Sequence, residues 1–216
     1  VVMGLTYVAF DLLNRMEYMD MLLNFVYGLS SGVIVAVLTV GILPLFEAIY
    51  KIVTPMKLME ISNPNQPLLK KLLLEAPGTY HHSIMVGNMA ERAADAVGAN
   101  ALLVRTAAYY HDVGKIKRPY FFVENHADSR NPHDNIDSKA SVDVITSHLS
   151  DGMDMLRRAG IPPIVQEIAS QHHGDTAVMY FYRKDKEESN YPENVKIENY
   201  RYKGNRPKTK EAGILM

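Results

Sequence analysis

The sequence has 216 residues, and its 23 Lys and Arg residues nearly balance 24 Asp and Glu residues, for a net charge of −1. This length suits one medium-sized domain with an appendage, and the balanced charge gives no electrostatic basis for binding a polymeric nucleic acid. The chain has no cysteine, which excludes disulfides and cysteine-ligated zinc sites.

An apolar stretch near the N-terminus predicts a membrane-spanning helix. Residues 21–46 contain no charged side chain, and about 20 apolar residues are enough to cross a bilayer. Residues 21–53 are therefore interpreted as a transmembrane helix with its flanks. Residues 1–13 have the composition of the end of another such helix, truncated at its start.

Basic residues follow this stretch and orient the remainder of the chain. Because cytoplasmic segments next to a membrane are enriched in Lys and Arg, residues 54–216 are predicted to form a cytoplasmic domain of a multi-pass protein in the cell membrane. The basic residues concerned are Lys51, Lys57, Lys70 and Lys71.

Two predicted helices after the loop at 61–67 each carry a histidine on an apolar face, since side chains three or four residues apart share a face. His82 begins a stripe that continues to Val97. His111 is in register with Ala108, in a segment that Gly114 is expected to close as a C-terminal cap.

Two later segments repeat this arrangement. His148 is in line with Val144, and His172 follows Ile168 in a segment that Pro163 opens. All four histidines are expected to point inward. A buried imidazole without a partner costs a few kcal/mol, roughly, and metal coordination removes that cost.

Asp112 and His173 each directly follow an inward histidine near the end of a helix, so the chain can turn them toward the same centre. A carboxylate there can bridge two cations, which predicts a two-metal hydrolytic site. Three other histidines, His81, His126 and His133, lie off the stripe or in polar loops and are interpreted as ordinary. The predicted metal ligands are His82, His111, Asp112, His148, His172 and His173.

Ligation by several imidazoles favours transition metals over magnesium. The site is expected to hold two divalent ions, with iron or manganese as the preferred metal. Two such ions lower the pKa of a shared water and stabilise the entering and leaving oxygens of a displacement at phosphorus. A hydroxide between the ions is expected to be the nucleophile. This agrees with the lack of a Ser or Cys constellation elsewhere in the sequence.

Basic and aromatic residues near the predicted site are candidates for substrate contacts. Lys115 is expected to bind a nonbridging phosphate oxygen, with Lys117 and Arg118 as supplements; basic residues after a helix also commonly complement its negative end. The aromatic run 120–122 is expected to fill the core. Tyr202, flanked by Tyr200 and Arg201, is a candidate contact for a nucleobase.

The remaining segments complete an all-α prediction. Residues 125–137 and most of 183–210 are expected to be loop, because charge, Asn and Pro break any helical period there. Residues 178–182 could pair as a short strand of a small hairpin. The rest is expected to be a helical bundle around the two-metal site, preceded by the transmembrane helix.

Two runs, LEAPGTYHHSIMVGNMAE from Leu74 and AYYHDVGKIKRPYFFVE from Ala108, resemble the HD-domain metal phosphohydrolases. More narrowly, they resemble the seven-transmembrane HD proteins, the PgpH-type cyclic di-AMP phosphodiesterases. The resemblance also covers Ile61-Ser62-Asn63-Pro64-Asn65 and Gln171-His172-His173-Gly174. It implies hydrolysis of cyclic di-AMP to linear pApA, and it implies the ligand set above with Asp112 bridging and Lys115 beside the phosphate.

One departure and several alternatives stay open. The family's remaining ligand is an Asp in a Leu-Ala-Asp run expected just past Met216, so the ion held by His82, His111 and Asp112 is expected to be incompletely ligated by this sequence. The alternatives are a phosphohydrolase for cyclic di-GMP or a nucleotide monomer, a di-iron oxygenase, and a non-catalytic nucleotide sensor. The GYP signature of cyclic di-GMP enzymes is missing after His173. The sequence leaves homodimer formation open.

Overall fold

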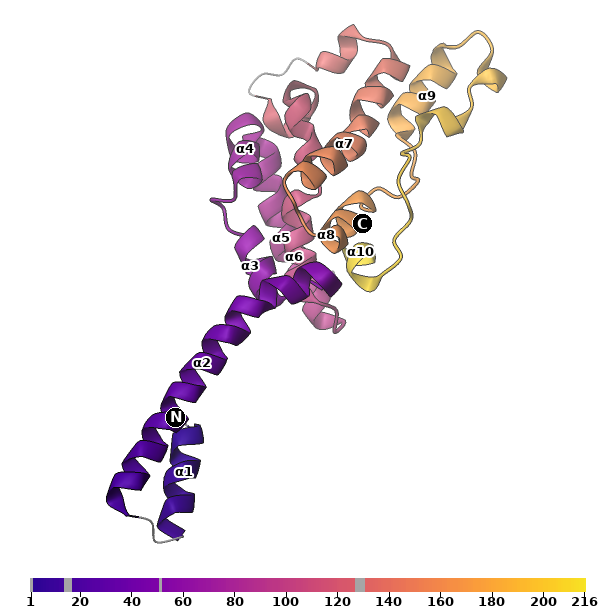
Figure 1. Ribbon diagram of the computed structural model, residues 1–216. Coiled ribbons are helices and arrows are strands. Elements are labelled where there is room, and N and C mark those ends of the chain that lie inside the picture. Colours follow the sequence, from indigo (N-terminus) through magenta and orange to yellow (C-terminus); the bar gives the residue numbers. More distant parts are fainter. Residues whose placement is uncertain (1, 14–16, 51, 127–130) are drawn as a thin grey trace. The chain divides into compact units, whose positions relative to one another are not determined.

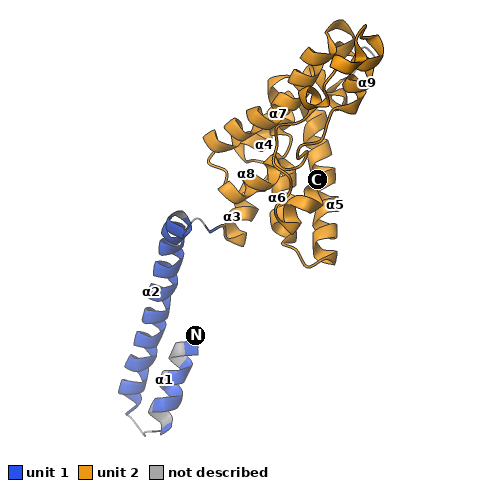
Figure 2. Cartoon of the chain, turned by 90° about the vertical axis from the view of Figure 1, so that its right-hand side faces the viewer, with its two compact units in different colours: residues 1–52 blue, residues 53–216 orange. Residues whose placement is uncertain are grey.

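The computed structural model describes residues 2–13, 17–50, 52–126 and 131–216 (Figure 1). Within these ranges the chain is helical and contains no regular strand, and an isolated antiparallel bridge joins Ala177 to Arg201. The all-α prediction is confirmed. The chain divides into two compact units, residues 1–52 and 53–216 (Figure 2).

The first unit consists of α1 (Val2–Leu13) and α2 (Tyr18–Tyr50), which pack against each other. The segment Tyr18–Glu47 is long and apolar enough to cross a membrane, and its most apolar window has no buried residue. A helix of a water-soluble domain would bury one apolar stripe. Here large side chains such as Val37 and Val40 are each 66% exposed, which suits a lipid environment.

The second unit is a bundle of α-helices, with 3-10 turns between α6 and α7 and between α9 and α10. Proline occupies the first turn of several of these helices, where its missing N–H costs nothing. The α-helices are α3 (Pro55–Ile61), α4 (Pro67–Glu75), α5 (Pro77–Ala96), α6 (Ala101–Tyr110), α7 (Ser138–Arg158), α8 (Pro163–Ser170), α9 (Met179–Glu188) and α10 (Lys210–Leu215). The 3-10 turns are η1 (Val113–Lys117), η2 (Pro119–Phe121), η3 (Val123–Asn125), η4 (Pro132–Asn135), η5 (Pro192–Asn194) and η6 (Ile197–Tyr200).

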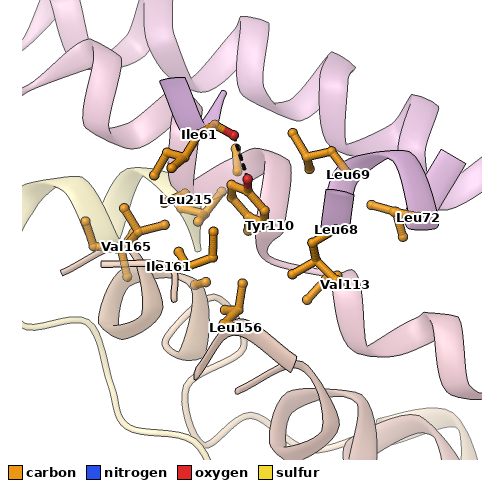
Figure 3. Packing of buried hydrophobic residues seen from close by; sticks show 14 of the residues in the cluster. Ile61, Leu68, Leu69, Leu72, Tyr110, Val113, Leu156, Ile161, Val165 and Leu215 are labelled. Atoms are coloured by element: carbon orange, nitrogen blue, oxygen red, sulfur yellow. Dashed lines mark hydrogen bonds between the residues drawn. The ribbon is translucent and has the colours of Figure 1, made fainter. Parts of the chain in front are cut away.

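The main core of this unit surrounds α6 and ends next to the site. Tyr110 at the end of α6 is fully buried, and its hydroxyl donates a hydrogen bond to the Ile61 carbonyl at 2.5 Å (Figure 3). Burial raises the pKa of this phenol. Apolar side chains from α4, α8 and α10 pack around it, including Leu72, Val165 and Leu215. The last turn of α6, which presents His111, is thereby fixed.

Val178 caps α9 and residues 179–182 lie within that helix, so the prediction of a strand at 178–182 is wrong. The helix extends into the predicted loop as far as Glu188. Phe181 is buried against Val142 and Tyr200, with Val178 and Tyr182 partly buried beside it. These positions follow a helical period of three to four residues. This packing outweighs the β-propensity of the aromatic residues.

The buried face of α5 also differs from the predicted stripe. Met89 and Val97 are 62% and 55% exposed, and the buried residues of α5 are small: Thr79, Ser83, Gly87, Ala90 and Ala94. A Cβ on Gly87 would lie 2.6 Å from the Tyr109 ring. The two helices approach too closely for large side chains, which therefore point outward.

Candidate metal centre

The structure brings the six predicted ligands together from four parts of the second unit. His82 lies in the first turns of α5, His111 caps α6, and His148 lies in the middle of α7. His172 and His173 lie in the turn after α8. Their ligand atoms form two groups, each within 4.8 Å: Asp112 with His148, His172 and His173, and Asp112 with His82 and His111.

Three of the rings are held by the backbone of their own helix. Nδ1 of His111 lies 2.7 Å from the Ala108 carbonyl. His148 and His172 make the same contact, each at 2.6 Å, with the carbonyl three residues earlier. A carbonyl only accepts, so Nδ1 carries the proton and Nε2 presents a lone pair. Metal-binding histidines are oriented by contacts of this kind.

The lone pairs converge on Asp112. Its Oδ2 lies 3.1 Å from Nε2 of His111, and its Oδ1 lies 3.3 Å from Nε2 of His148 and 3.6 Å from Nε2 of His172. Oδ1 is buried and has no hydrogen-bond partner. Nε2 of His148 and Nε2 of His172 are themselves 3.3 Å apart, with no proton to share.

This donor set fits cations. Atoms that bind one transition metal at about 2.0–2.2 Å lie roughly 3–3.5 Å from one another, which matches the spacing around Asp112. A buried carboxylate oxygen without a hydrogen bond, facing unprotonated ring nitrogens, is unfavourable unless positive charge compensates it. Because Asp112 belongs to both groups, one carboxylate can serve two ions.

The charge state of two rings also suits metal binding, which needs neutral imidazole. Burial lowers the pKa of His148 to about 4. Burial, reinforced by His172 and His148, lowers the pKa of His173 to about 3. Both rings are therefore neutral near pH 7.

Asp112 stays ionised despite its burial. Burial alone would raise its pKa, but the adjacent His111, the His172 ring and Lys115 together hold that pKa well below its usual range. In the same way burial would lower the pKa of His111, and the Asp112 carboxylate with the Ala108 carbonyl raises it overall. The carboxylate is thus available as an anionic ligand.

His82 differs from the other histidines. Its side chain is 47% exposed, and its Nε2 lies 3.9 Å from Oδ2 of Asp112. The prediction that all four histidines point inward is wrong for His82, because it follows from the apolar stripe that α5 leaves exposed. His82 lies at the rim of the centre, facing His111.

Gly114 is not a left-handed helix cap as predicted, since α6 ends at Tyr110 and Gly114 lies within η1. Its function is close approach to α7: a Cβ there would lie 1.9 Å from the His148 carbonyl oxygen and 2.5 Å from the Gly152 amide nitrogen. Only glycine lets η1, which follows Asp112, contact the backbone of the helix that carries His148.

A cavity of about 550 Å³ opens beside the ligand group of Asp112, His148, His172 and His173. His148, His173 and Lys115 are among its lining residues, and its walls are largely aromatic. The aromatic run 120–122 was predicted to fill the core, but only Phe122 is buried, and Tyr120 is 56% exposed. Phe121 and Phe122 both line the cavity. This volume falls in the range of sites for small ligands.

Tyr202 lies in this cavity, as the base-contact prediction requires, and it stacks on the His173 ring with centroids 4.1 Å apart. Its backbone amide donates to the Thr176 carbonyl at 2.8 Å. Gly174, with φ of +53°, turns the chain directly after the histidine pair. The neighbours of Tyr202 form hydrogen bonds within the protein. Arg201 donates to the Asp175 carbonyl, and buried Tyr200 donates to the Asp185 carboxylate.

Lys117 and Arg118 lie away from the cavity lining. Both form ion pairs with Asp151 of α7, at 2.7 and 2.8 Å, and their side chains are 47% and 42% exposed. Their contact with phosphate stays a prediction. The ion pairs with Asp151 disfavour it, because they already engage both cationic groups.

Several residues of the site escaped sequence reasoning. His126 and His133, interpreted as ordinary, both line the cavity, and His133 is buried with Nε2 3.0 Å from the Phe121 carbonyl. Glu124 also lines the cavity and contacts Lys115. Its only sequence signal is a lone carboxylate after an aromatic run, which is too weak to assign a function.

Comparison with known families agrees with this geometry. The HD-domain family model matches residues 79–216, which include every ligand described above. The chain belongs to the HD-domain family. Residues 1–54 match a second family model, described as a 7TM receptor with intracellular HD hydrolase.

Two bacterial relatives match most of the chain. The chain is 48% identical over 188 residues to the cyclic-di-AMP phosphodiesterase PgpH of Bacillus subtilis, covering 87% of the chain and 26% of that protein. It is 49% identical over 189 residues to PgpH of Listeria monocytogenes, covering 88% of the chain and 26% of that protein. The chain thus spans about a quarter of the length of these relatives.

The fold has a solved counterpart. The crystal structure of the L. monocytogenes PgpH HD domain in complex with cyclic-di-AMP superimposes with a TM-score of 0.67 at 52% identity, covering 71% of this chain and 70% of that one. The match confirms the predicted HD-domain bundle.

Proposed function

We propose that the chain belongs to a membrane-anchored, metal-dependent phosphodiesterase that hydrolyses cyclic di-AMP to linear pApA. One observation carries the proposal: five imidazoles converge on a single shared carboxylate, Asp112, beside an aromatic cavity of about 550 Å³. Relatives that bear the name cyclic-di-AMP phosphodiesterase support the choice of substrate.

In the proposed reaction, water adds to one phosphorus while its bond to the 3′ oxygen breaks. The leaving 3′ oxygen takes up a proton, and the new 5′-phosphate ends a linear dinucleotide. His82, His111 and Asp112 would hold one ion, and Asp112, His148, His172 and His173 the other, with iron or manganese as the metal. Such ions lower the pKa of water and stabilise charge on the phosphate.

The side chains of the chain itself supply positioning. The Nδ1 contacts of His111, His148 and His172 keep the Nε2 atoms facing Asp112. Lys115 places an ammonium group at the edge of the cavity, where it can bind a nonbridging phosphate oxygen. Phe122 and Tyr202 offer ring faces to a nucleobase. The bound phosphodiester is thereby oriented for attack.

The test is metal analysis of the purified protein combined with product chromatography. The protein loaded with manganese or iron should convert cyclic di-AMP to pApA and should act more slowly on cyclic di-GMP. A metal-loaded protein that forms no linear product would exclude the phosphodiesterase. Faster hydrolysis of cyclic di-GMP than of cyclic di-AMP would mean that the enzyme prefers guanine to adenine.

The membrane part of the proposal rests on α2 and on the basic residues that follow it. It places α2 across the cell membrane and residues 53–216 in the cytoplasm. Protease treatment of membrane vesicles tests this orientation: the catalytic unit should be digested in inside-out vesicles and protected in right-side-out ones. The reverse pattern would place the unit outside.

A further inference from the structure

We propose that Glu124 is a positioning residue that keeps the Lys115 ammonium away from Asp112 when metal occupies the centre. This inference rests on the proposed function, because it concerns the lysine of the same site. Glu124 itself belongs to neither ligand group.

Lys115 is shared between two carboxylates. Its Nζ lies 2.9 Å from Oδ2 of Asp112 and 2.7 Å from Oε1 of Glu124, and its side chain is only 13% exposed. The ammonium also lies 4.8 Å from the centre of the Phe122 ring. Two carboxylates face the buried ammonium, and this geometry favours its charged form. Two of its three hydrogens are engaged, which leaves one for a substrate oxygen.

Glu124 is itself fixed by the start of α5. The Thr79 hydroxyl donates to the same Oε1 at 2.9 Å, and the Asn125 side-chain amide binds both the Thr79 hydroxyl and the Thr79 backbone amide. The backbones also touch, since a Cβ on Gly78 would lie 1.7 Å from the Glu124 carbonyl oxygen. The position of the Glu124 carboxylate is therefore set by the fold and not by Lys115.

The two partners of Lys115 respond differently to metal. Asp112 is the carboxylate shared by both ligand groups, so cations there compete with the ammonium for Oδ2 and repel it. Glu124 belongs to neither ligand group and keeps its full charge. It therefore holds the lysine at the cavity edge and reduces its competition with metal for Asp112.

A charge-neutral replacement separates this function from a structural one. Glu124→Gln retains an oxygen that can accept from Thr79 but removes the charge, so Lys115 should depend on Asp112 alone and oppose metal binding. The apparent affinity for Mn²⁺ should fall about tenfold, the scale of an outer-shell contact. Adding Lys115→Ala to this variant should restore the affinity to within about twofold of the wild type.

The matched control is Glu91→Gln. Glu91 pairs with Arg105 at 2.8 Å between α5 and α6, and it is 29% exposed against 25% for Glu124. This control should leave Mn²⁺ affinity unchanged. Thr79→Val, which removes the hydroxyl that donates to Glu124, should weaken Mn²⁺ binding in the same direction by about threefold.

Two results would overturn the inference: Glu124→Gln with wild-type Mn²⁺ affinity, or a double variant as weak as the single one. Turnover gives a second readout in four proteins: the wild type, Glu124→Gln, Lys115→Ala and the double variant. Glu124→Gln should lower kcat for cyclic di-AMP and cause no further loss in the Lys115→Ala background. If no variant, wild type included, forms pApA, the proposed function fails while the Mn²⁺ titrations still decide the inference.

Discussion

The two sides of Asp112 are built in different ways. On one side, the rings of His111, His148 and His172 each face the carboxylate with Nδ1 bound to a carbonyl three residues earlier. On the other side, Lys115 is held by Glu124, and Glu124 is held by Thr79, which lies 45 residues earlier in the chain.

This difference predicts how each side responds to substitution. The histidine side depends on local backbone contacts, within α7 for His148 and at the ends of α6 and α8 for His111 and His172, so its rings stay oriented as long as the helices form. The lysine side depends on a contact between η3 and the start of α5. Changes on the histidine side should therefore remove metal and activity together, whereas changes on the lysine side should adjust affinity and rate.

The largest expected effect is that of Asp112→Ala. It removes the carboxylate that both ligand groups share, so the remaining imidazoles lose their anionic partner and neither ion is held. Bound metal should disappear, and cyclic di-AMP hydrolysis should fall to the background rate, as measured by metal analysis and product chromatography. Near wild-type activity with metal supplied would show that Asp112 is not the shared ligand.

Gly114→Ala should come next, because it disturbs the contact that joins the two sides. The new Cβ would lie 1.9 Å from the His148 carbonyl oxygen, and backbone atoms cannot yield as a flexible side chain would. We expect a loss of about 1–3 kcal/mol in the free energy of unfolding, together with weaker Mn²⁺ binding.

Denaturant unfolding and Mn²⁺ titration of the same protein measure both effects. The matched control is Gly213→Ala in α10, where a Cβ meets nothing within 4 Å. A Gly114→Ala protein as stable as this control would mean that η1 and α7 are less closely packed than described.

The histidine side could be predicted from the sequence, because each of its residues is placed by the helix in which or next to which it lies. Each of His111, His148 and His172 shares a helical register with buried apolar residues such as Ala108 and Ile168, and a period of three to four residues is readable without tertiary information. His82 was assigned to the correct cluster from an incorrect apolar stripe. The close packing of α5 on α6 buries small residues and leaves the large apolar side chains of the predicted stripe exposed. The all-α class followed from the same periodicity.

The lysine side and the cavity could not be predicted in this way. Glu124, Thr79 and Asn125 meet only after the fold is complete, across 45 and 46 residues. Phe181 enters the cavity wall because it lies in the helix Met179–Glu188 and not in the strand expected at 178–182. Contacts of this kind leave no periodic trace in the sequence.

Tyr202→Ala tests the aromatic wall, which lies outside both sides of Asp112. A base stacked on an aromatic ring is worth about 1–3 kcal/mol, so KM for cyclic di-AMP should rise about tenfold. Tyr202→Phe keeps the ring and should retain near wild-type KM. Metal content should stay intact in both; its loss in Tyr202→Ala would mean that the stacking on His173 serves the ligand and not the substrate.

The smallest expected effect is that of Lys117→Ala, and it separates two lysines that lie two residues apart. Lys115 is nearly buried and faces the cavity, whereas Lys117 is 47% exposed and pairs with Asp151. An exposed ion pair contributes about 0–1 kcal/mol, so kcat/KM for cyclic di-AMP should change less than about twofold, while Lys115→Ala lowers kcat with metal content retained. A comparable loss in both variants would restore Lys117 as a phosphate contact and would extend the lysine side of Asp112 to the surface of α7.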